Sequence, residues 1–177
     1  DYPDFEFPSD TFALTNGSYF NSSAIISCDG KTCLATNDYD KHFKEYFKEG
    51  STAEFAKKDD KSYRVGALAR IKLNKHLLSE KSKSFVPQLP KSEDNPFMNI
   101  PAQAIEIYEG IEQAINILQA LKLKPEELPK IKPINASGVS ATEAPRGILF
   151  HKYSFKDGKC TFANITTPTT QNLQNIE

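Results

Sequence analysis

The first 37 residues mix short apolar stretches with polar turns, and this pattern predicts a β-rich segment over residues 1–37. The large apolar residues in its middle part are Phe12, Leu14, Tyr19, Phe20, Ile25 and Ile26. They are interrupted by Asn16-Gly17 and Asp29-Gly30, and such dipeptides favour hairpin turns because Asn, Asp and Gly tolerate a positive φ. Antiparallel hairpins are therefore expected in this segment.

The length of the second turn decides how two cysteines are placed. A two-residue turn at Asp29-Gly30 places Cys28 opposite Lys31. A loop that extends two residues further places Cys28 opposite Cys33, and only this register allows a cross-strand disulfide. The sequence leaves both registers open.

Residues 38–97 are expected to contain short helices and loops. Phe43, Tyr46 and Phe47 repeat at i, i+3 and i+4 among Lys and Glu residues. This spacing predicts a short amphipathic helix within residues 38–58, with the aromatic side chains on one face.

The second half of that stretch is first apolar and then polar. Arg64–Asn74 is compact and apolar, which predicts a buried turn or a short helix. Residues 75–97 contain prolines and many Lys and Ser residues, a composition typical of a surface excursion. Within this excursion, the sequence leaves open whether residues 74–82 form a short helix.

The strongest helical pattern lies within residues 98–123 and runs from Pro101 to Leu123. Proline suits the first position of a helix, where its missing N–H needs no partner. One wide apolar stripe runs along the length of the predicted helix, and Glu106 and Glu109 lie largely outside this stripe. The stripe consists of Ile100, Ala104, Ile107, Tyr108, Ile111, Ala114, Ile115, Leu118 and Leu121. Such a helix is expected in a core or at an interface.

The C-terminal third is expected to contain a second hairpin. Residues 124–133 are rich in proline and should be extended. Apolar residues then flank Asp157-Gly158, which predicts a hairpin over residues 147–166. This hairpin and the turn before it form the last part of the expected domain, residues 134–172. The whole chain, residues 1–177, is expected to be a single α+β domain with short antiparallel hairpins packed around one long helix.

Composition narrows the classes of function. The 22 Lys and Arg residues nearly balance the 23 Asp and Glu residues, and a net charge of −1 argues against binding to nucleic acids or anionic membranes. No apolar run approaches the roughly 18 residues of a membrane span. The first residues do not form a signal peptide, and three cysteines do not fit a secreted disulfide framework. A cytoplasmic protein is therefore expected, and the missing initial Met favours a piece of a longer chain.

The common active-site motifs do not occur in the sequence. His42, His76 and His151 are scattered, and no spacing of His and Cys fits a zinc site. Neither a glycine-rich nucleotide loop nor a nucleophile elbow is found. Composition and spacing alone lead to a soluble α+β domain.

Two motifs near the C-terminus are more specific. Residues 143–149 read E-A-P-R-G-I-L and residues 168–172 read P-T-T-Q-N, with the predicted hairpin between them. This pair resembles the large, catalytic subunit of [NiFe]-hydrogenases, and most closely their soluble cytoplasmic, multi-subunit branch. Residues 2–5, 13–17 and 63–70 agree with the resemblance, which therefore extends over most of the chain.

The resemblance implies a parent enzyme that oxidises H2 and reduces protons at a Ni–Fe centre whose iron carries CO and cyanide ligands. In the family, four cysteines in two C-x-x-C pairs bind the metals, and this sequence has neither pair. The chain is therefore expected to be the middle of a large subunit, with no metal and no activity of its own. Its partners would be an iron–sulfur small subunit and further electron-transfer subunits.

The resemblance also assigns roles to residues of the two motifs. Arg146 matches an arginine that lies beside the open nickel position and donates to a cyanide through a guanidinium with five fixed donors. Thr169 matches the residue that donates to the second cyanide. Pro145 and Pro168 match apolar walls around the diatomic ligands, and Glu143 is expected to orient Arg146.

Further expectations concern geometry and rival functions. With a regular hairpin, the Cα atoms of Arg146 and Thr169 should lie within about 10 Å of each other. One face of the chain should expose a large apolar patch, because the rest of a larger subunit would cover it. His151 is either part of a proton path or a packing residue. The rival functions are a metal-free hydrogenase relative of the respiratory complex I type and a non-catalytic interaction module.

Overall fold

The computed structural model describes residues 2–28, 31–130 and 135–176, and it combines three sheets with a helical end. The strands are β1 (Asp10–Gly17), β2 (Ser22–Cys28), β3 (Lys31–Ala35), β4 (Phe43–Phe47), β5 (Glu54–Lys58), β6 (Tyr63–Arg64), β7 (Ala136–Ala144), β8 (Gly147–Lys156) and β9 (Lys159–Thr166). The α-helices are α1 (Tyr39–His42), α2 (Ala67–Asn74), α3 (Glu80–Phe85), α4 (Asn99–Ala120) and α5 (Pro168–Asn172). Short 3-10 helices span Thr36–Asp38, Lys75–Leu77, Val86–Gln88, Pro96–Met98 and Leu173–Asn175.

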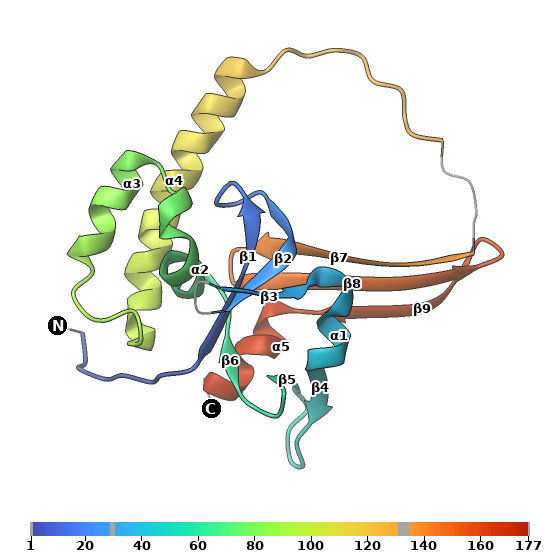
Figure 1. Cartoon of the computed structure of the whole chain (residues 1–177), viewed down its shortest axis with the longest axis horizontal. Helices are drawn as coiled ribbons and strands as arrows, with labels where there is room; N and C mark the ends of the chain where they lie inside the picture. The colour runs from blue at the N-terminus through green and yellow to red at the C-terminus, as the bar shows by residue number, and fades with distance from the viewer. Residues whose placement is uncertain (1, 29–30, 131–134, 177) are drawn as a thin grey trace.

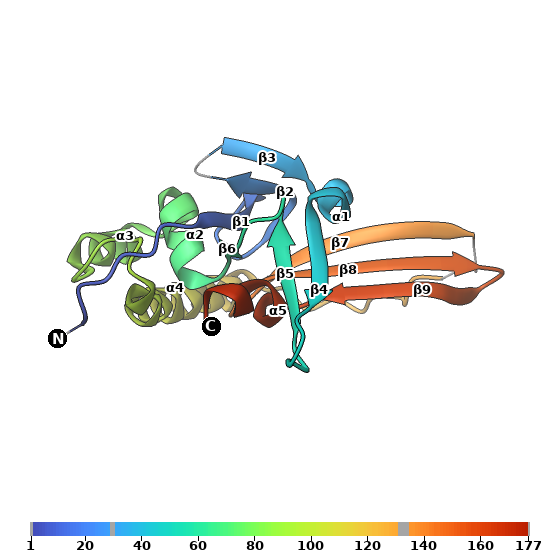
Figure 2. The ribbon, with the colours of Figure 1, turned by 90° about the horizontal axis from the view of Figure 1, so that it is seen from below.

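The helices and the longest strands lie at opposite ends of the molecule. Figure 1 shows α2, α3 and α4 together at one end and the sheet β7–β9 extending from the other, with β1, β2 and β3 between them. Figure 2 shows the same separation from below. The predicted α+β class, with one helix much longer than the others, is confirmed.

The N-terminal residues form the predicted β-hairpins. β1 pairs antiparallel with β2, β2 pairs antiparallel with β3, and the short β6 joins β1 in parallel. Cys28 lies opposite Lys31, so this strand pair does not have the register that places Cys28 opposite Cys33. The turn residues 29–30 lie outside the described residues.

Residues 38–58 do not form the predicted amphipathic helix. Only the single turn of α1 is helical, and Phe43 begins β4, which pairs antiparallel with β5. The aromatic residues do not share a buried face, because Phe43 is buried whereas Phe47 is 69% exposed. Gly50, with a φ of +80°, lies in the connection between β4 and β5. Phe55 on β5 is buried, as Phe43 is on β4. Strand pairing across this connection therefore overrides the helical spacing of the aromatic residues.

Helix α2 confirms a buried short helix within residues 64–74, since nearly all of its residues are buried. The following stretch is a surface excursion, as predicted, but its helix α3 begins at Glu80 and not at Asn74. Ser79 explains the later start, because its hydroxyl accepts a hydrogen bond from the backbone N–H of Ser82 at 3.3 Å.

Helix α4 is present, but the face it buries is not the predicted stripe. It begins at Asn99, before Pro101, and it buries Ala102, Ile105, Glu106 and Glu109. The predicted stripe is largely exposed, at Ile100, Ile107, Ile111, Ile115, Leu118 and Leu121. Figure 1 shows the C-terminal half of α4 extending beyond α2 and α3. A core position for the stripe is therefore wrong within the described chain, and the interface alternative stays a prediction.

The segment after α4 leads to the C-terminal sheet. Residues 121–130 form neither helix nor strand, and residues 131–134 lie outside the described residues. Within the described ranges, no helix combines the length and the apolar character that a bilayer span requires.

The C-terminal hairpin is confirmed and has a third strand. β8 and β9 join at Asp157-Gly158, where both residues have a positive φ. A bulge places Tyr153 opposite Ala163, one residue away from the Phe162 partner of a regular ladder. β7, which the sequence analysis did not predict, pairs with the other edge of β8.

Two hydrophobic clusters pack these elements together. The first lies among the strands and contains Phe12, Leu14, Tyr39, Phe43, Ala56, Tyr63, Val65, Ile148 and Phe150. The second lies between α2 and the first half of α4 and contains Tyr19, Ala67, Leu68, Ile71, Leu78, Met98, Ala102 and Ile105. Val65 belongs to the first cluster and Ala67 to the second, so the connection between β6 and α2 is fixed from both sides.

Candidate functional site

The E-A-P-R-G motif forms the end of β7, a tight turn and the start of β8. Ala144 pairs with Gly147, so Pro145 and Arg146 are the two residues of the turn. Gly147 has a φ of +133°, a region that residues with a Cβ rarely adopt. A Cβ on Gly147 would lie 2.3 Å from Cγ2 of Val65. The turn therefore packs directly on the connection between β6 and α2, and this close approach requires glycine.

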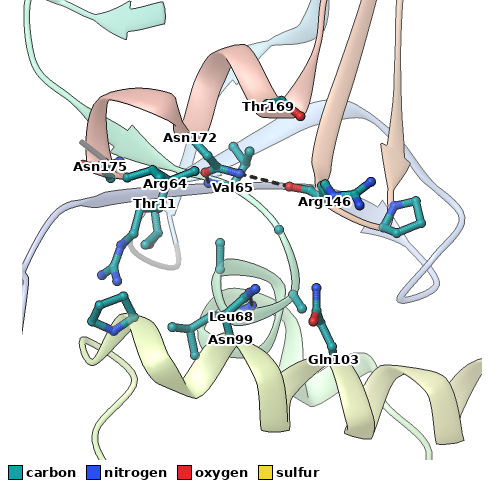
Figure 3. A pocket seen from close by; sticks show the side chains of 16 residues that line it. Thr11, Arg64, Val65, Leu68, Asn99, Gln103, Arg146, Thr169, Asn172 and Asn175 are labelled. Atoms are coloured by element: carbon teal, nitrogen blue, oxygen red, sulfur yellow. Dashed lines mark hydrogen bonds between the residues drawn. The ribbon is translucent and has the colours of Figure 1, made fainter. Parts of the chain in front are cut away.

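Arg146 and Thr169 line the same cavity, as Figure 3 shows. The cavity has a volume of about 350 Å3 and lies between α5, the start of α2 and the start of α4. Pro145 also lines it, whereas Pro168 is buried and is not part of its wall. Three of the four residues that the resemblance places around a cofactor thus border one space.

The side chains of Arg146 and Thr169 have unused hydrogen-bond donors. Both residues are exposed, and neither the guanidinium nor the hydroxyl has a hydrogen-bond partner in the described part of the chain. A guanidinium offers a permanent charge and five N–H donors, and a hydroxyl adds one more. The pair therefore suits an anionic or strongly accepting group within the cavity.

Asn172, the last residue of P-T-T-Q-N, links the turn to the segment before α2. Its side-chain amide donates to the backbone oxygen of Arg146 at 3.1 Å, and its Oδ1 accepts from the backbone N–H of Val65 at 3.0 Å. Figure 3 shows Asn172 on α5 between these two partners. The sequence analysis assigned Asn172 no role, although its place in the motif was a visible signal.

Arg70 contacts the turn from the other side, and the sequence analysis missed it as a functional residue. It lies on α2 with a side chain that is 1% exposed. Its Nη1 donates to the carbonyl oxygen of Ala144 at 3.0 Å, and its Nη2 to that of Pro145 at 3.1 Å. The guanidinium also binds both carboxylate oxygens of Glu106 and one of Glu143, each at 2.7 Å. The signal in the sequence was an arginine within an apolar run, because a buried charge needs partners.

Glu143 does not contact the residue that it was expected to orient. Its side chain is 2% exposed and pairs with Arg70, and its second oxygen accepts from the backbone N–H of Leu14 at 2.7 Å. Arg146, by contrast, is exposed at the turn. The partner predicted for Glu143 is therefore wrong, because its buried side chain reaches the cation on α2.

The surroundings of Glu143 affect its protonation. Burial raises the pKa of this carboxyl, and the charge of Arg70 and the N–H of Leu14 act in the opposite direction. Because Arg70 and Leu14 both bind the ionised form, the charge of Glu143 has a partner on each oxygen.

Arg70, Glu106, Glu143 and Tyr19 form a buried ionic cluster. The Tyr19 hydroxyl donates to Oε1 of Glu106 at 2.8 Å, and burial, followed by the charge of Glu106, raises its pKa. Burial tends to lower the pKa of Arg70, but the hydrogen bonds and charges of the two carboxylates outweigh it and raise this pKa. Arg70 is therefore a permanent cation. A second cavity of about 480 Å3 borders Arg70 and the two carboxylates.

The site offers donors and walls and no metal ligands. Among the described residues, no group of three or more His, Cys, Asp or Glu side chains could bind a metal ion. Cys160 is exposed on β9, and its thiol contacts the backbone oxygen of Phe162. His151 bonds through Nδ1 to the Tyr153 hydroxyl at 2.8 Å and borders neither cavity. A Ni–Fe centre at this site would therefore need ligands from outside these residues.

Comparison with known proteins identifies relatives of the chain. It is 38% identical over 86% of its length to sulfhydrogenase 1 subunit alpha of Pyrococcus furiosus. It is 32% identical over 90% of its length to the NAD-reducing hydrogenase HoxS subunit beta of Cupriavidus necator. The chain spans 36% of the length of each of these relatives. No family model matches it.

Solved structures with a similar fold are also hydrogenases. An NAD+-reducing [NiFe]-hydrogenase in the H2-reduced state matches with a TM-score of 0.68 and 23% identity, covering 95% of this chain and 42% of its own. The Ni-Fe-Se hydrogenase of D. vulgaris Hildenborough also has a TM-score of 0.68, at 22% identity, covering 92% of this chain and 43% of its own. These two likenesses show the fold alone. The chain is thus homologous to a segment that makes up about a third of the length of its hydrogenase-subunit relatives, and it has the fold found in [NiFe]-hydrogenases. Both findings confirm the resemblance predicted from its two motifs.

Proposed function

We propose that this chain is a central segment of the catalytic subunit of a [NiFe]-hydrogenase and that the complete subunit catalyses the reversible oxidation of H2. The observation that supports the proposal is the cavity shared by Arg146 and Thr169, whose donors have no partner in the described chain. The sequence relatives are hydrogenase subunits, which agrees with this role. The segment alone is expected to be inactive.

In the complete enzyme, a Ni–Fe centre with CO and cyanide ligands, bound by residues outside this segment, would supply the redox chemistry. Arg146 would place a permanent positive charge and directional donors against an anionic ligand. Thr169 would add a hydroxyl donor, and Pro145 an apolar wall. Because a guanidinium stays protonated, Arg146 would act electrostatically and not as a base.

Replacement of Arg146 by Lys in the complete subunit, assembled with its partners, tests the proposal. Lys keeps the charge but loses the planar set of donors. The rate of H2 oxidation should fall by about a hundredfold, the loss typical of a preorganised donor, while bound nickel and iron stay unchanged. Lys156→Gln, an exposed cation at the other end of β8, is the control and should change neither quantity. Full activity of the Arg146→Lys enzyme would refute the proposal.

The partners of the complete subunit belong to the same proposal. We propose an iron–sulfur small subunit and further electron-transfer subunits, because the relatives are named as subunits of larger hydrogenases. A cytoplasmic location is part of the proposal as well. Co-purification of an iron–sulfur subunit with the complete chain would support it, and a complete chain that is active alone would contradict it.

A second candidate is a metal-free hydrogenase relative of the complex I type. The described residues contain no group able to bind a metal ion, and this agrees with both candidates, because the first takes its metal ligands from outside this segment. Metal analysis of the complete subunit separates the two candidates. About one nickel per subunit supports the hydrogenase, and a folded subunit without nickel supports the metal-free relative.

A further inference from the structure

We infer that Arg70 is a positioning residue for Arg146, because its buried guanidinium fixes the backbone of the turn from which Arg146 borders the cavity. This inference rests on the proposed function, in which Arg146 contacts the reacting group. Arg70 is not one of the residues that line the cavity of Arg146, so it would act only through the turn.

The guanidinium of Arg70 uses all of its donors. Nε and one N–H of Nη2 bind the two oxygens of Glu106 side by side, each at 2.7 Å. Nη1 binds Glu143 at 2.7 Å and the carbonyl of Ala144 at 3.0 Å. The second N–H of Nη2 binds the carbonyl of Pro145 at 3.1 Å. Five N–H groups thus have five acceptors, and two of these acceptors are the peptide carbonyls that directly precede Arg146.

The carboxylates that bind Arg70 are themselves fixed in place. Glu106 is buried on α4 and accepts a hydrogen bond from the Tyr19 hydroxyl. Glu143 accepts one from the backbone N–H of Leu14 in β1. Charge-assisted hydrogen bonds to a planar guanidinium are strong and directional. The plane of Arg70, and with it the direction of the two turn carbonyls, is therefore set from α4 and β1 together.

The opposite end of the turn has its own attachment. Asn172 binds the backbone oxygen of Arg146, and Gly66 approaches that oxygen so closely that a Cβ on Gly66 would lie 2.9 Å from it. A change at Arg70 should therefore free the peptides of residues 144–145 while the hairpin stays folded. Because the Arg146 side chain has no partner of its own in the described chain, its direction depends on this backbone.

The test compares Arg70→Lys with Glu106→Gln in the complete subunit assembled with its partners. Lys has three donors around a point charge and therefore cannot satisfy the five acceptors that Arg70 binds. Glu106→Gln keeps the side-chain shape and weakens only one side of the guanidinium. The control is Lys72→Gln on the same helix, where the ammonium pairs with Asp94 on the surface at 2.8 Å.

Two readouts separate positioning from a merely structural role. The first is hydrogen exchange of the peptide 143–149, measured with and without bound metal. The second is kcat and KM for H2, measured in the native background and in an Arg146→Lys background. A loss of kcat with an unchanged KM is typical of an interaction that acts in the transition state.

Arg70→Lys should lower kcat about tenfold, because Arg146 loses its fixed direction, and leave KM unchanged. The peptide 143–149 should exchange about tenfold faster, with or without metal. In the Arg146→Lys background the same substitution should cost less than about twofold, since both changes act on one group. Glu106→Gln should show the same pattern with a smaller amplitude, and Lys72→Gln should show none of it.

An equal fold-loss of kcat from Arg70→Lys in both backgrounds would overturn the inference, as would unchanged exchange of the peptide 143–149. If the Arg70→Lys subunit does not assemble, Glu106→Gln decides by the same two readouts. An unchanged kcat of the Arg146→Lys enzyme would instead refute the proposed function. Hydrogen exchange alone then decides on positioning, with faster exchange supporting it and unchanged exchange rejecting it.

Discussion

The exposed donors of Thr169 and Arg146 differ from the buried donors of Arg70 in what they can do. A donor bonded within the protein stabilises the fold, whereas a donor without a partner is available to a bound group. Every N–H of the Arg70 guanidinium has an acceptor, and the Thr169 hydroxyl has none among the described residues. Substitutions at these residues should therefore change different quantities.

Thr169→Val removes the hydroxyl and keeps the shape of the side chain. The free energy of unfolding of the 177-residue chain should change by less than about 0.5 kcal/mol, because the residue is exposed. In the complete subunit, the rate of H2 oxidation should fall about tenfold, the worth of one hydrogen bond to a charged group. Thr169→Ser is the matched control and should keep most of the rate. A Val variant with the native rate at saturating H2 would show that this hydroxyl has no functional acceptor.

At the residue scale, the motifs contain three residues that border one cavity, Pro145, Arg146 and Thr169, but Pro168 lies outside its wall, and the motifs did not predict what fixes the turn. Arg146 and Thr169 belong to motifs that the sequence displays. The partner of Glu143, however, is Arg70, which lies 73 positions earlier in the chain. An ion pair over that distance leaves no local pattern, so only the arginine within an apolar run pointed to it.

At the scale of the element, the one long amphipathic pattern predicted its helix correctly, although not the face that the helix buries, and the short amphipathic pattern predicted the wrong element. The helical period of α4 is repeated over 22 residues, and the helix is present. The three aromatic residues of 43–47 span too few positions to distinguish a helix from a strand, and pairing with β5 decided the outcome. β7 contains Gly, Ser, Thr and Ala without a clear alternation, and it pairs along its whole length with β8. Short elements thus depend on partners that the local sequence does not reveal.

Gly66, in the connection between β6 and α2, carries a prediction at this scale. Its φ is +114°, and a Cβ there would lie 2.9 Å from the backbone oxygen of Arg146. Gly66→Ala should therefore lower the free energy of unfolding by about 2–4 kcal/mol, measured by urea denaturation.

Gly138→Ala is the matched control for Gly66→Ala. Gly138 lies on β7, and a Cβ built on it would meet no atom within 4 Å. This substitution should change the free energy of unfolding by less than about 0.5 kcal/mol. Equal effects of the two substitutions would contradict the requirement for a close approach between α2 and the turn.

At the scale of the whole molecule, the two halves of α4 have different surroundings. The first half buries Ala102 and Ile105 against α2, within the second hydrophobic cluster. The second half leaves Ile111, Ile115 and Leu118 at 56%, 48% and 69% exposure. The sequence identified this stripe correctly as apolar. It could not show which face of the helix is covered, because that depends on which elements lie beside it.

The exposed face of α4 leads to a prediction about the isolated chain. Ile111 and Ile115 are adjacent on one face of the helix, and contiguous apolar surface of this kind binds hydrophobic dyes and promotes self-association. The double substitution Ile111→Lys and Ile115→Lys should therefore lower dye fluorescence and the concentration dependence of the sedimentation coefficient. The free energy of unfolding should change by less than about 1 kcal/mol, since both side chains already face solvent.

Ile105→Lys, on the buried face of the same helix, is the control. It should lower the free energy of unfolding by more than about 3 kcal/mol, because it places a charge within the second cluster. If the double substitution destabilised the chain as much as Ile105→Lys, this face of α4 would have to be covered within the chain itself.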